Sequence, residues 1–142
     1  GTVAITSTVA SSSSTTASTT AGTSAVGSVE VYQLFAVTVV DDGGNKYFLD
    51  GSNQTGSAIT LNEGSTYRFD QSHSSNSGHP LRFSTTSNGT HGGGSEYTTG
   101  VTTAGTPGSA GAYTQITVAV GAPTLYYYCT NHSAMGWQGN TP

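Results

Sequence analysis

A cysteine, a histidine and a methionine lie within seven residues of one another near the end of this chain. They are Cys129, His132 and Met135, spaced Cys-x2-His-x2-Met, and the sequence contains no other cysteine or methionine. Thiolate and thioether sulfur select Cu(I), whereas imidazole nitrogen suits copper in either oxidation state. The spacing therefore predicts a copper-binding loop.

Such a loop needs one more ligand, because a trigonal copper site uses two histidines and a cysteine, with a long axial bond to methionine. His79 is the candidate. It lies fifty residues before Cys129, in Ser77-Gly-His-Pro-Leu-Arg-Phe83, at the start of a short apolar stretch. A β-sandwich would place this stretch beside the strand that ends at Cys129, so we predict a single copper site that includes His79.

Each residue also has an ordinary interpretation. A lone cysteine is usually a small buried apolar residue, a methionine fills the core, and a loop histidine is solvated. The joint spacing directly after a Tyr-Tyr-Tyr run favours the metal loop. A cysteine nucleophile paired with His132 is less suitable, because the two lie on one tight loop before a methionine. Neither Gly-x-Ser-x-Gly nor His-Glu-x-x-His occurs, and we expect no enzyme.

The loop resembles that of the cupredoxins, and the resemblance covers about Val29 to Pro142. Cupredoxins of the amicyanin type have the same short spacing between cysteine, histidine and methionine. The resemblance implies a Greek-key β-sandwich. The ligands it implies are His79, Cys129 and His132 in the plane, Met135 on the axis, and the carbonyl of Gly78 approaching opposite Met135.

Three longer stretches look like the cupredoxin-like modules of large structural proteins from marine cyanophages and related marine sequences. These stretches are Asn45–Gly51, Gly78–Val101 and Tyr126–His132. This resemblance implies a component of a virion or surface assembly, at an extracellular or virion-surface location.

Pro80 is a departure from many blue-copper proteins, in which an asparagine follows the first histidine and donates its backbone N–H to the cysteine sulfur. Proline has no N–H. Loss of a donor leaves more electron density on the sulfur, so we expect a lower reduction potential than in those proteins.

Charged residues make up only 7% of the chain, and the net charge is −4. This composition argues against nucleic acid and anionic membranes as partners, and abundant Gly, Ser and Thr suit an extracellular setting. No apolar stretch approaches the ~20 residues of a membrane span. The chain begins without methionine, and we expect a processed form or a segment of a longer protein.

Residues 1–28 have the composition of a linker, with Ser, Thr, Ala, Gly and Val almost throughout. Such a tract cannot bury enough apolar surface to order itself alone. Its start, Thr2–Val9, alternates like a strand. We expect this segment to link the chain to further copies or to other structural subunits by strand addition. The alternative is a tail held by its own domain.

From residue 29 to residue 142 the pattern is all β, typical of a sandwich of about seven or eight strands. Glycines at Asp41–Gly44 predict a hairpin turn. The expected strands are Val29–Val40 with a break near Gln33, Lys46–Leu49, Ala58–Leu61, Ser65–Phe69, Leu81–Ser84, Tyr113–Val120 and Thr124–Cys129. We expect Thr85–Gly111 to be a long surface loop, and His73 and His91 to be solvated loop histidines.

Three functions fit these observations. The preferred one is a structural module of an extracellular assembly, such as a phage fibre, an appendage or a surface filament, that carries the copper site. The alternative is a soluble blue-copper electron carrier, with His132 as the electron exit and with Ala134, Met135 and Trp137 as an apolar docking patch. In a third version, compatible with the first, the metal only stabilises the folded state.

Overall fold

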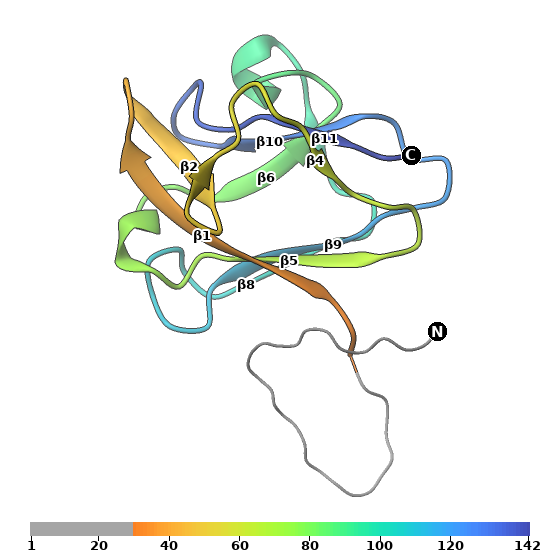
Figure 1. Cartoon of the computed structure of the whole chain (residues 1–142), viewed down its shortest axis with the longest axis horizontal. Helices are drawn as coiled ribbons and strands as arrows, with labels where there is room; N and C mark the ends of the chain where they lie inside the picture. Colours follow the sequence, from red (N-terminus) through yellow and green to blue (C-terminus); the bar gives the residue numbers. More distant parts are fainter. Residues whose placement is uncertain (1–29) are drawn as a thin grey trace, which may run out of the picture.

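Two β-sheets packed face to face form the body of the protein (Figure 1). The computed structural model describes residues 30–142. Within them lie eleven strands, three of which have only two residues, so the all-β sandwich is confirmed with more strands than the seven or eight expected. The predicted linker or inter-subunit segment, residues 1–28, lies outside the described residues. None of the described residues forms a helix long and apolar enough to cross a membrane.

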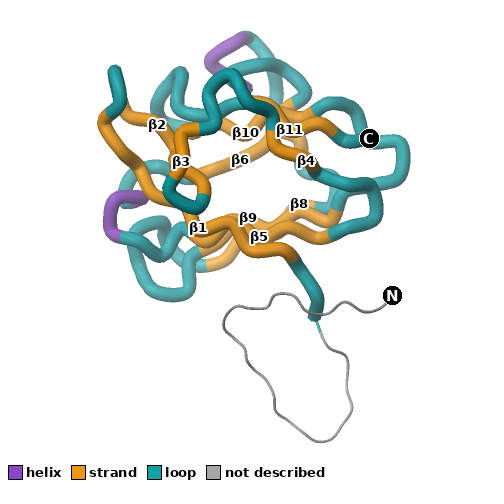
Figure 2. Tube along the Cα trace, in the orientation of Figure 1, coloured by secondary structure: helices purple, strands orange, loops and turns teal. Residues whose placement is uncertain are grey.

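Both sheets are mixed, because β1 runs parallel to β5 and β4 runs parallel to β11. The six-stranded sheet has the order β3-β2-β1-β5-β9-β8, with β1 (Gln33–Asp41), β2 (Asn45–Leu49), β3 (Ser52–Asn53), β5 (Thr66–Asp70), β8 (Val101–Ala104) and β9 (Tyr113–Thr117). The five-stranded sheet has the order β4-β11-β10-β6-β7, with β4 (Ile59–Thr60), β6 (Leu81–Ser84), β7 (Glu96–Tyr97), β10 (Leu125–Cys129) and β11 (Gln138–Asn140). Two short 3-10 helices, η3 (Ser74–Asn76) and η4 (Gly89–Gly92), lie in the connections and are purple in Figure 2.

The core lies between the sheets because alternate side chains of each strand point inward. In β1, for example, Phe35 and Val37 are buried while Ala36 is exposed. The aromatic rings meet across the interface: Phe69 stacks on Phe35 at 4.9 Å and meets Phe83 edge-on at 5.4 Å. These contacts fix the two sheets relative to each other, and so fix the loops at their ends.

The expectation of a plain surface loop over Thr85–Gly111 was wrong. This segment contains η4, β7 and the edge strand β8. Its high content of Ser, Thr and Gly hides the strand signal, but Val101 packs against the core and β8 pairs with β9. The first strand begins at Gln33, where the sequence predicted a break within Val29–Val40, and residues 30–32 do not belong to it.

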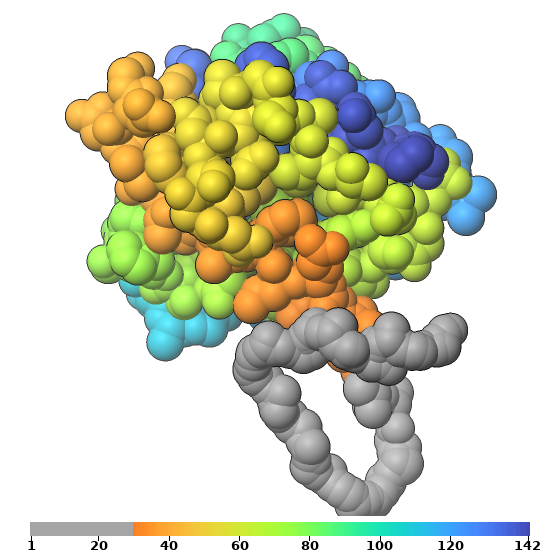
Figure 3. Space-filling view, in the orientation of Figure 1, coloured from red at the N-terminus to blue at the C-terminus, as the bar shows by residue number. Residues whose placement is uncertain are grey.

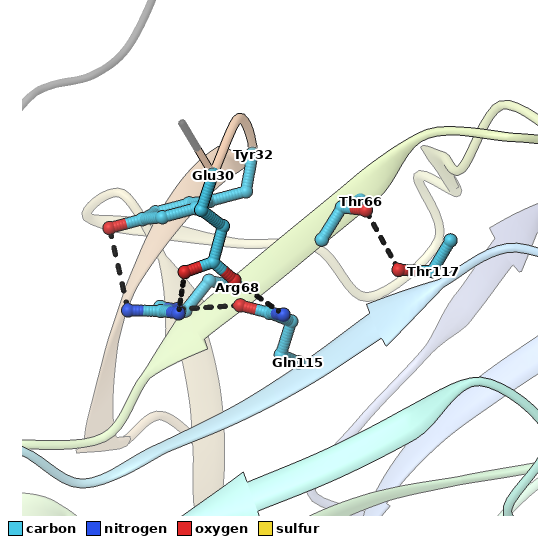
Figure 4. Close-up of polar contacts among 6 residues, drawn as sticks. All are labelled: Glu30, Tyr32, Thr66, Arg68, Gln115 and Thr117. Carbon is cyan, nitrogen blue, oxygen red and sulfur yellow. Dashed lines mark hydrogen bonds and ion pairs between the residues drawn. The ribbon is translucent and has the colours of Figure 1, made fainter. Parts of the chain in front are cut away.

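A cluster on the outer face of the six-stranded sheet fixes the start of the described chain (Figure 4). The guanidinium of Arg68 lies between two aromatic rings, 4.2 Å from that of Tyr32 and 3.8 Å from that of Tyr113. It donates to Gln115 and pairs with Glu30 at 3.1 Å, and Gln115 donates to the same carboxylate. In Figure 3 the orange residues of this stretch lie at the molecular surface, on the lower side of the view.

Candidate metal centre

Neighbouring strands bring the predicted ligands to one end of the sandwich. Strands β6 and β10 are antiparallel, and Leu81, the first residue of β6, pairs with Cys129, the last residue of β10. His79 precedes β6 by two residues, and His132 follows β10 by three. The loop that carries His132 is the dark blue one at the upper left of Figure 1. The antiparallel pairing therefore explains why residues fifty positions apart meet.

Three ligand atoms converge at this end. The Sγ of Cys129 lies 3.7 Å from the Nδ1 of His79 and 3.7 Å from the Nδ1 of His132, and the three atoms all lie within 4.8 Å of one another. Metal bonds of about 2.0 Å to nitrogen and about 2.3 Å to sulfur, at a trigonal angle of roughly 120°, separate the two atoms by about 3.7 Å. The spacing between sulfur and nitrogen thus fits one metal ion bound by all three residues.

The ligands differ in their exposure to solvent. Cys129 is fully buried, His79 is half-buried and His132 is exposed. Burial lowers the pKa of His79, and the positive charge of a protonated His132 nearby lowers it further. A lowered pKa keeps the imidazole of His79 neutral, and only the neutral ring has a lone pair for a metal.

Met135, the predicted axial ligand, is 2% exposed and belongs to the same apolar cluster as Cys129. Its carbonyl accepts a hydrogen bond from the backbone of Tyr47, which fixes the end of the loop. Because Met135 is buried, it is not part of an exposed docking patch, and that prediction is corrected. Ala134 is exposed, and Trp137 is 37% exposed.

A buried polar network holds the His79 carbonyl, and no sequence motif indicated it. The Tyr47 hydroxyl donates to this carbonyl at 2.6 Å, and the Gln71 amide donates to it at 2.7 Å. Gln71 also accepts from the backbone of Leu81, and its amide reaches Asn76, whose own amide donates to β1. Burial raises the pKa of Tyr47, and the neighbouring Cys129 adds to that effect. Gln71 and Asn76 lie in a polar stretch of the sequence between two strands, so only their spatial convergence identifies them.

Two hydrogen bonds join the loops that carry the ligands. The side-chain amide of Asn131 donates to the carbonyl of Gly78 at 2.9 Å. The backbone N–H of Thr130 donates to the carbonyl of Pro80 at 3.2 Å. The carbonyl of Pro80 therefore accepts a hydrogen bond, although its ring nitrogen cannot donate one. The Gly78 carbonyl faces the Asn131 amide, and its approach to a metal stays a prediction.

His91 is exposed, as expected, yet it is not simply solvated. Its Nε2 lies 2.8 Å from the carbonyl of Cys129, and since a carbonyl only accepts, Nε2 is the donor. His73 has a different role, because its Nδ1 accepts from the backbone of Ser75 and caps η3. Neither histidine joins the ligand atoms of the centre. The contact of His91 with Cys129 depends on the η4 fold, which the sequence pattern did not predict.

A solvent-open hollow of about 540 Å³ lies beside the centre and is lined by Asn45, His91, Asn131, His132, Ser133 and Met135.

Comparison of the chain with protein-family models, curated proteins and solved structures found no match. Two imidazole nitrogens and a thiolate suit a soft or borderline transition-metal ion such as copper or zinc. The centre can therefore hold one metal ion whose exposed edge, at His132, faces the hollow.

Proposed function

We propose that this protein is a copper-binding module with a single mononuclear centre. The observation that carries the proposal is the convergence of His79, Cys129 and His132 with sulfur–nitrogen distances of 3.7 Å. A trigonal set of two histidines and one cysteine, with a weak axial methionine, is the ligand set of blue copper. Met135 is buried in the same cluster and is the proposed axial ligand.

The fold supports a cupredoxin-like assignment. Two mixed sheets pack face to face, and the proposed ligands sit where β6 begins and β10 ends. We propose on these grounds, and on the residues of its loop, that the chain is a Greek-key sandwich of that family.

The proposed role is that of a structural module in an extracellular assembly, such as a virion fibre, an appendage or a surface filament. Residues 1–28 contain no charged residue and are mostly Ser, Thr and Ala, which suits a segment that links subunits. The metal would then stabilise a small sandwich by binding its folded state.

A second candidate function is one-electron transfer between Cu(II) and Cu(I). The observation that favours it is the exposure of His132, which opens onto the hollow while the sulfur stays buried. A metal reached through one exposed imidazole ring can exchange electrons with a partner at the surface.

Copper binding is tested by titrating the purified protein with Cu(II) and recording its visible spectrum beside Cys129→Ser and Met135→Leu. We expect an intense thiolate–copper band near ~600 nm. The band disappears in the serine variant and shifts, but persists, when only the axial ligand changes. A wild-type protein without this band, or one that takes zinc and rejects copper, would contradict the proposal.

The role is tested by size-exclusion chromatography and electron microscopy of the full chain and of residues 29–142. We expect the full chain to form oligomers or filaments and the shortened chain to be monomeric. If both are strictly monomeric, the assembly role is wrong, and reversible reduction of the copper band would then favour the electron carrier.

A further inference from the structure

We infer that the turn Asn88–His91, which contains most of η4, is a brace that holds the metal-binding loop in its ligating shape before any metal arrives. This inference rests on the proposed function for its purpose, but the brace itself is a property of the metal-free protein. Asn88 and His91 are positioning residues in this view, since they touch the backbone of the loop rather than the ligand atoms.

Two hydrogen bonds connect the turn to the loop. The Oδ1 of Asn88 accepts from the backbone N–H of Ala134 at 2.8 Å, one residue before Met135. The Nε2 of His91 donates to the carbonyl of Cys129 at 2.8 Å. The brace thus holds the loop near both of its ends, around the predicted ligands Cys129 and Met135.

Packing fixes the turn against the five-stranded sheet. A Cβ on Gly89 would lie 2.5 Å from ring carbons of Tyr128, so the backbone of the turn rests directly on that ring. The ring of His91 meets Tyr128 edge-on, with centroids 6.3 Å apart. Tyr128 precedes Cys129 in β10, so the brace and the cysteine share one rigid support.

The opposite side of the loop is held by β2. Lys46 donates its Nζ to the carbonyl of Ala134 at 2.7 Å, and the backbone of Tyr47 donates to the carbonyl of Met135. Ala134 has a φ of 63°, a left-handed conformation that a non-glycine residue keeps only when its surroundings fix it. A loop fixed from two sides does not have to be ordered by the metal, which strengthens binding through preorganisation.

The test uses pairs of variants that differ in one hydrogen bond. Asn88 has a φ of 65°, so Asn88→Gly keeps the backbone and removes the acceptor, whereas Asn88→Asp keeps an acceptor oxygen. His91→Phe keeps a ring against Tyr128 and removes the donor, whereas His91→Gln keeps a donor. Amide hydrogen exchange of the metal-free proteins measures how well the loop amides are protected, and the amides of β5 and β9 serve as the control for the fold.

In metal-free Asn88→Gly we expect the Ala134 amide to exchange at least about tenfold faster, and in His91→Phe we expect faster exchange across residues 129–135, with unchanged β5 and β9. Copper affinity, measured by competition with a chelator, should fall about tenfold in both, as is typical when groups around the ligands are removed. The thiolate–copper band should shift in both, and Asn88→Asp and His91→Gln should behave like the wild type.

Exchange of the loop at the wild-type rate in both Asn88→Gly and His91→Phe would overturn the brace, whatever the copper result. Faster exchange in a protein whose wild type binds no copper would support the brace and contradict the proposed function instead. Loss of β5 and β9 protection in both variants would also overturn the inference, because the turn would then stabilise the whole sandwich and not the loop.

Discussion

Gln71 shows how much one buried side chain can contribute to this centre. It is 1% exposed, and its amide joins the His79 carbonyl, the Asn76 side chain and the backbone of Leu81. A buried polar group costs free energy unless it forms a hydrogen bond. Here the His79 carbonyl, the Asn76 side chain and the N–H of Leu81 each form one with the side chain of Gln71. The residue therefore couples the position of a ligand to the stability of the fold.

We expect Gln71→Leu to lower the free energy of unfolding by about 2–4 kcal/mol, because it leaves the buried N–H of Leu81 and the Asn76 oxygen without this partner. Denaturation with urea measures the change. Gln33→Leu is the matched control, since Gln33 is exposed in β1 and should change stability by about 0.5 kcal/mol or less. Equal losses of unfolding free energy in Gln71→Leu and Gln33→Leu would show that the buried network does not stabilise the fold.

The buried tyrosines make stability fall at high pH. Burial raises the pKa of Tyr127, and burial is also the main cause of the raised pKa of Tyr47 and of Tyr128. In the unfolded chain a tyrosine ionises near pH ~10. The unfolded state therefore releases protons first, and the stabilisation, complete below that pH, is lost as pH rises through the folded values.

We accordingly expect the free energy of unfolding to decrease between about pH 9 and about pH 12, measured by denaturant titration at each pH. Tyr127→Phe should make this decrease smaller and should change little at neutral pH. A decrease of the same size in wild type and variant would mean that Tyr127 ionises equally easily in both states.

The element that the sequence pattern missed, η4, allows a matched test of packing. A Cβ at Gly89 would lie 2.5 Å from the Tyr128 ring, whereas one at Gly93 meets nothing within 4 Å, although both residues have a positive φ. We expect Gly89→Ala to cost about 2–4 kcal/mol and Gly93→Ala only about 1 kcal/mol. Thermal unfolding of the two variants measures the difference, and similar midpoints would show that η4 does not pack firmly on β10.

Strands with strong alternation were predictable, and weakly patterned ones were not. The sequence predicted Leu81–Ser84 at its observed bounds, because Leu81 and Phe83 alternate with polar residues. It also predicted the hairpin turn between β1 and β2, where two glycines adopt positive φ. Strand β8 was missed because Val-Thr-Thr-Ala has a weak pattern, and its pairing with β9 decides its conformation.

At the scale of the whole molecule, the start of the described chain and the metal centre lie far apart along β1. Tyr47, whose hydroxyl contacts the His79 carbonyl, pairs with Val39, six residues after Gln33. Six residues of strand span about 20 Å. The cluster around Arg68 fixes Glu30 and Tyr32 just before Gln33, so the two features should respond to mutation independently.

We expect Arg68→Ala to speed amide exchange in residues 30–34 and to cost about 1–2 kcal/mol, mostly from lost stacking, since the partner Glu30 is 54% exposed and its ion pair is weak. The copper spectrum should not change. Arg68→Lys keeps the charge but not the planar stack, and should resemble the alanine variant. An altered copper band in Arg68→Ala would show that the two ends of β1 are coupled.

The sequence by itself determined the all-β class and the residue types of the candidate centre, because β alternation and residue type are local properties of the chain. The candidates His79, Cys129 and His132 could be chosen from residue type and spacing alone. Only the tertiary structure decided that these three atoms converge, that Met135 is buried, and that η4 braces the loop. Convergence depends on the register between β6 and β10, and the brace depends on hydrogen bonds between segments about forty residues apart.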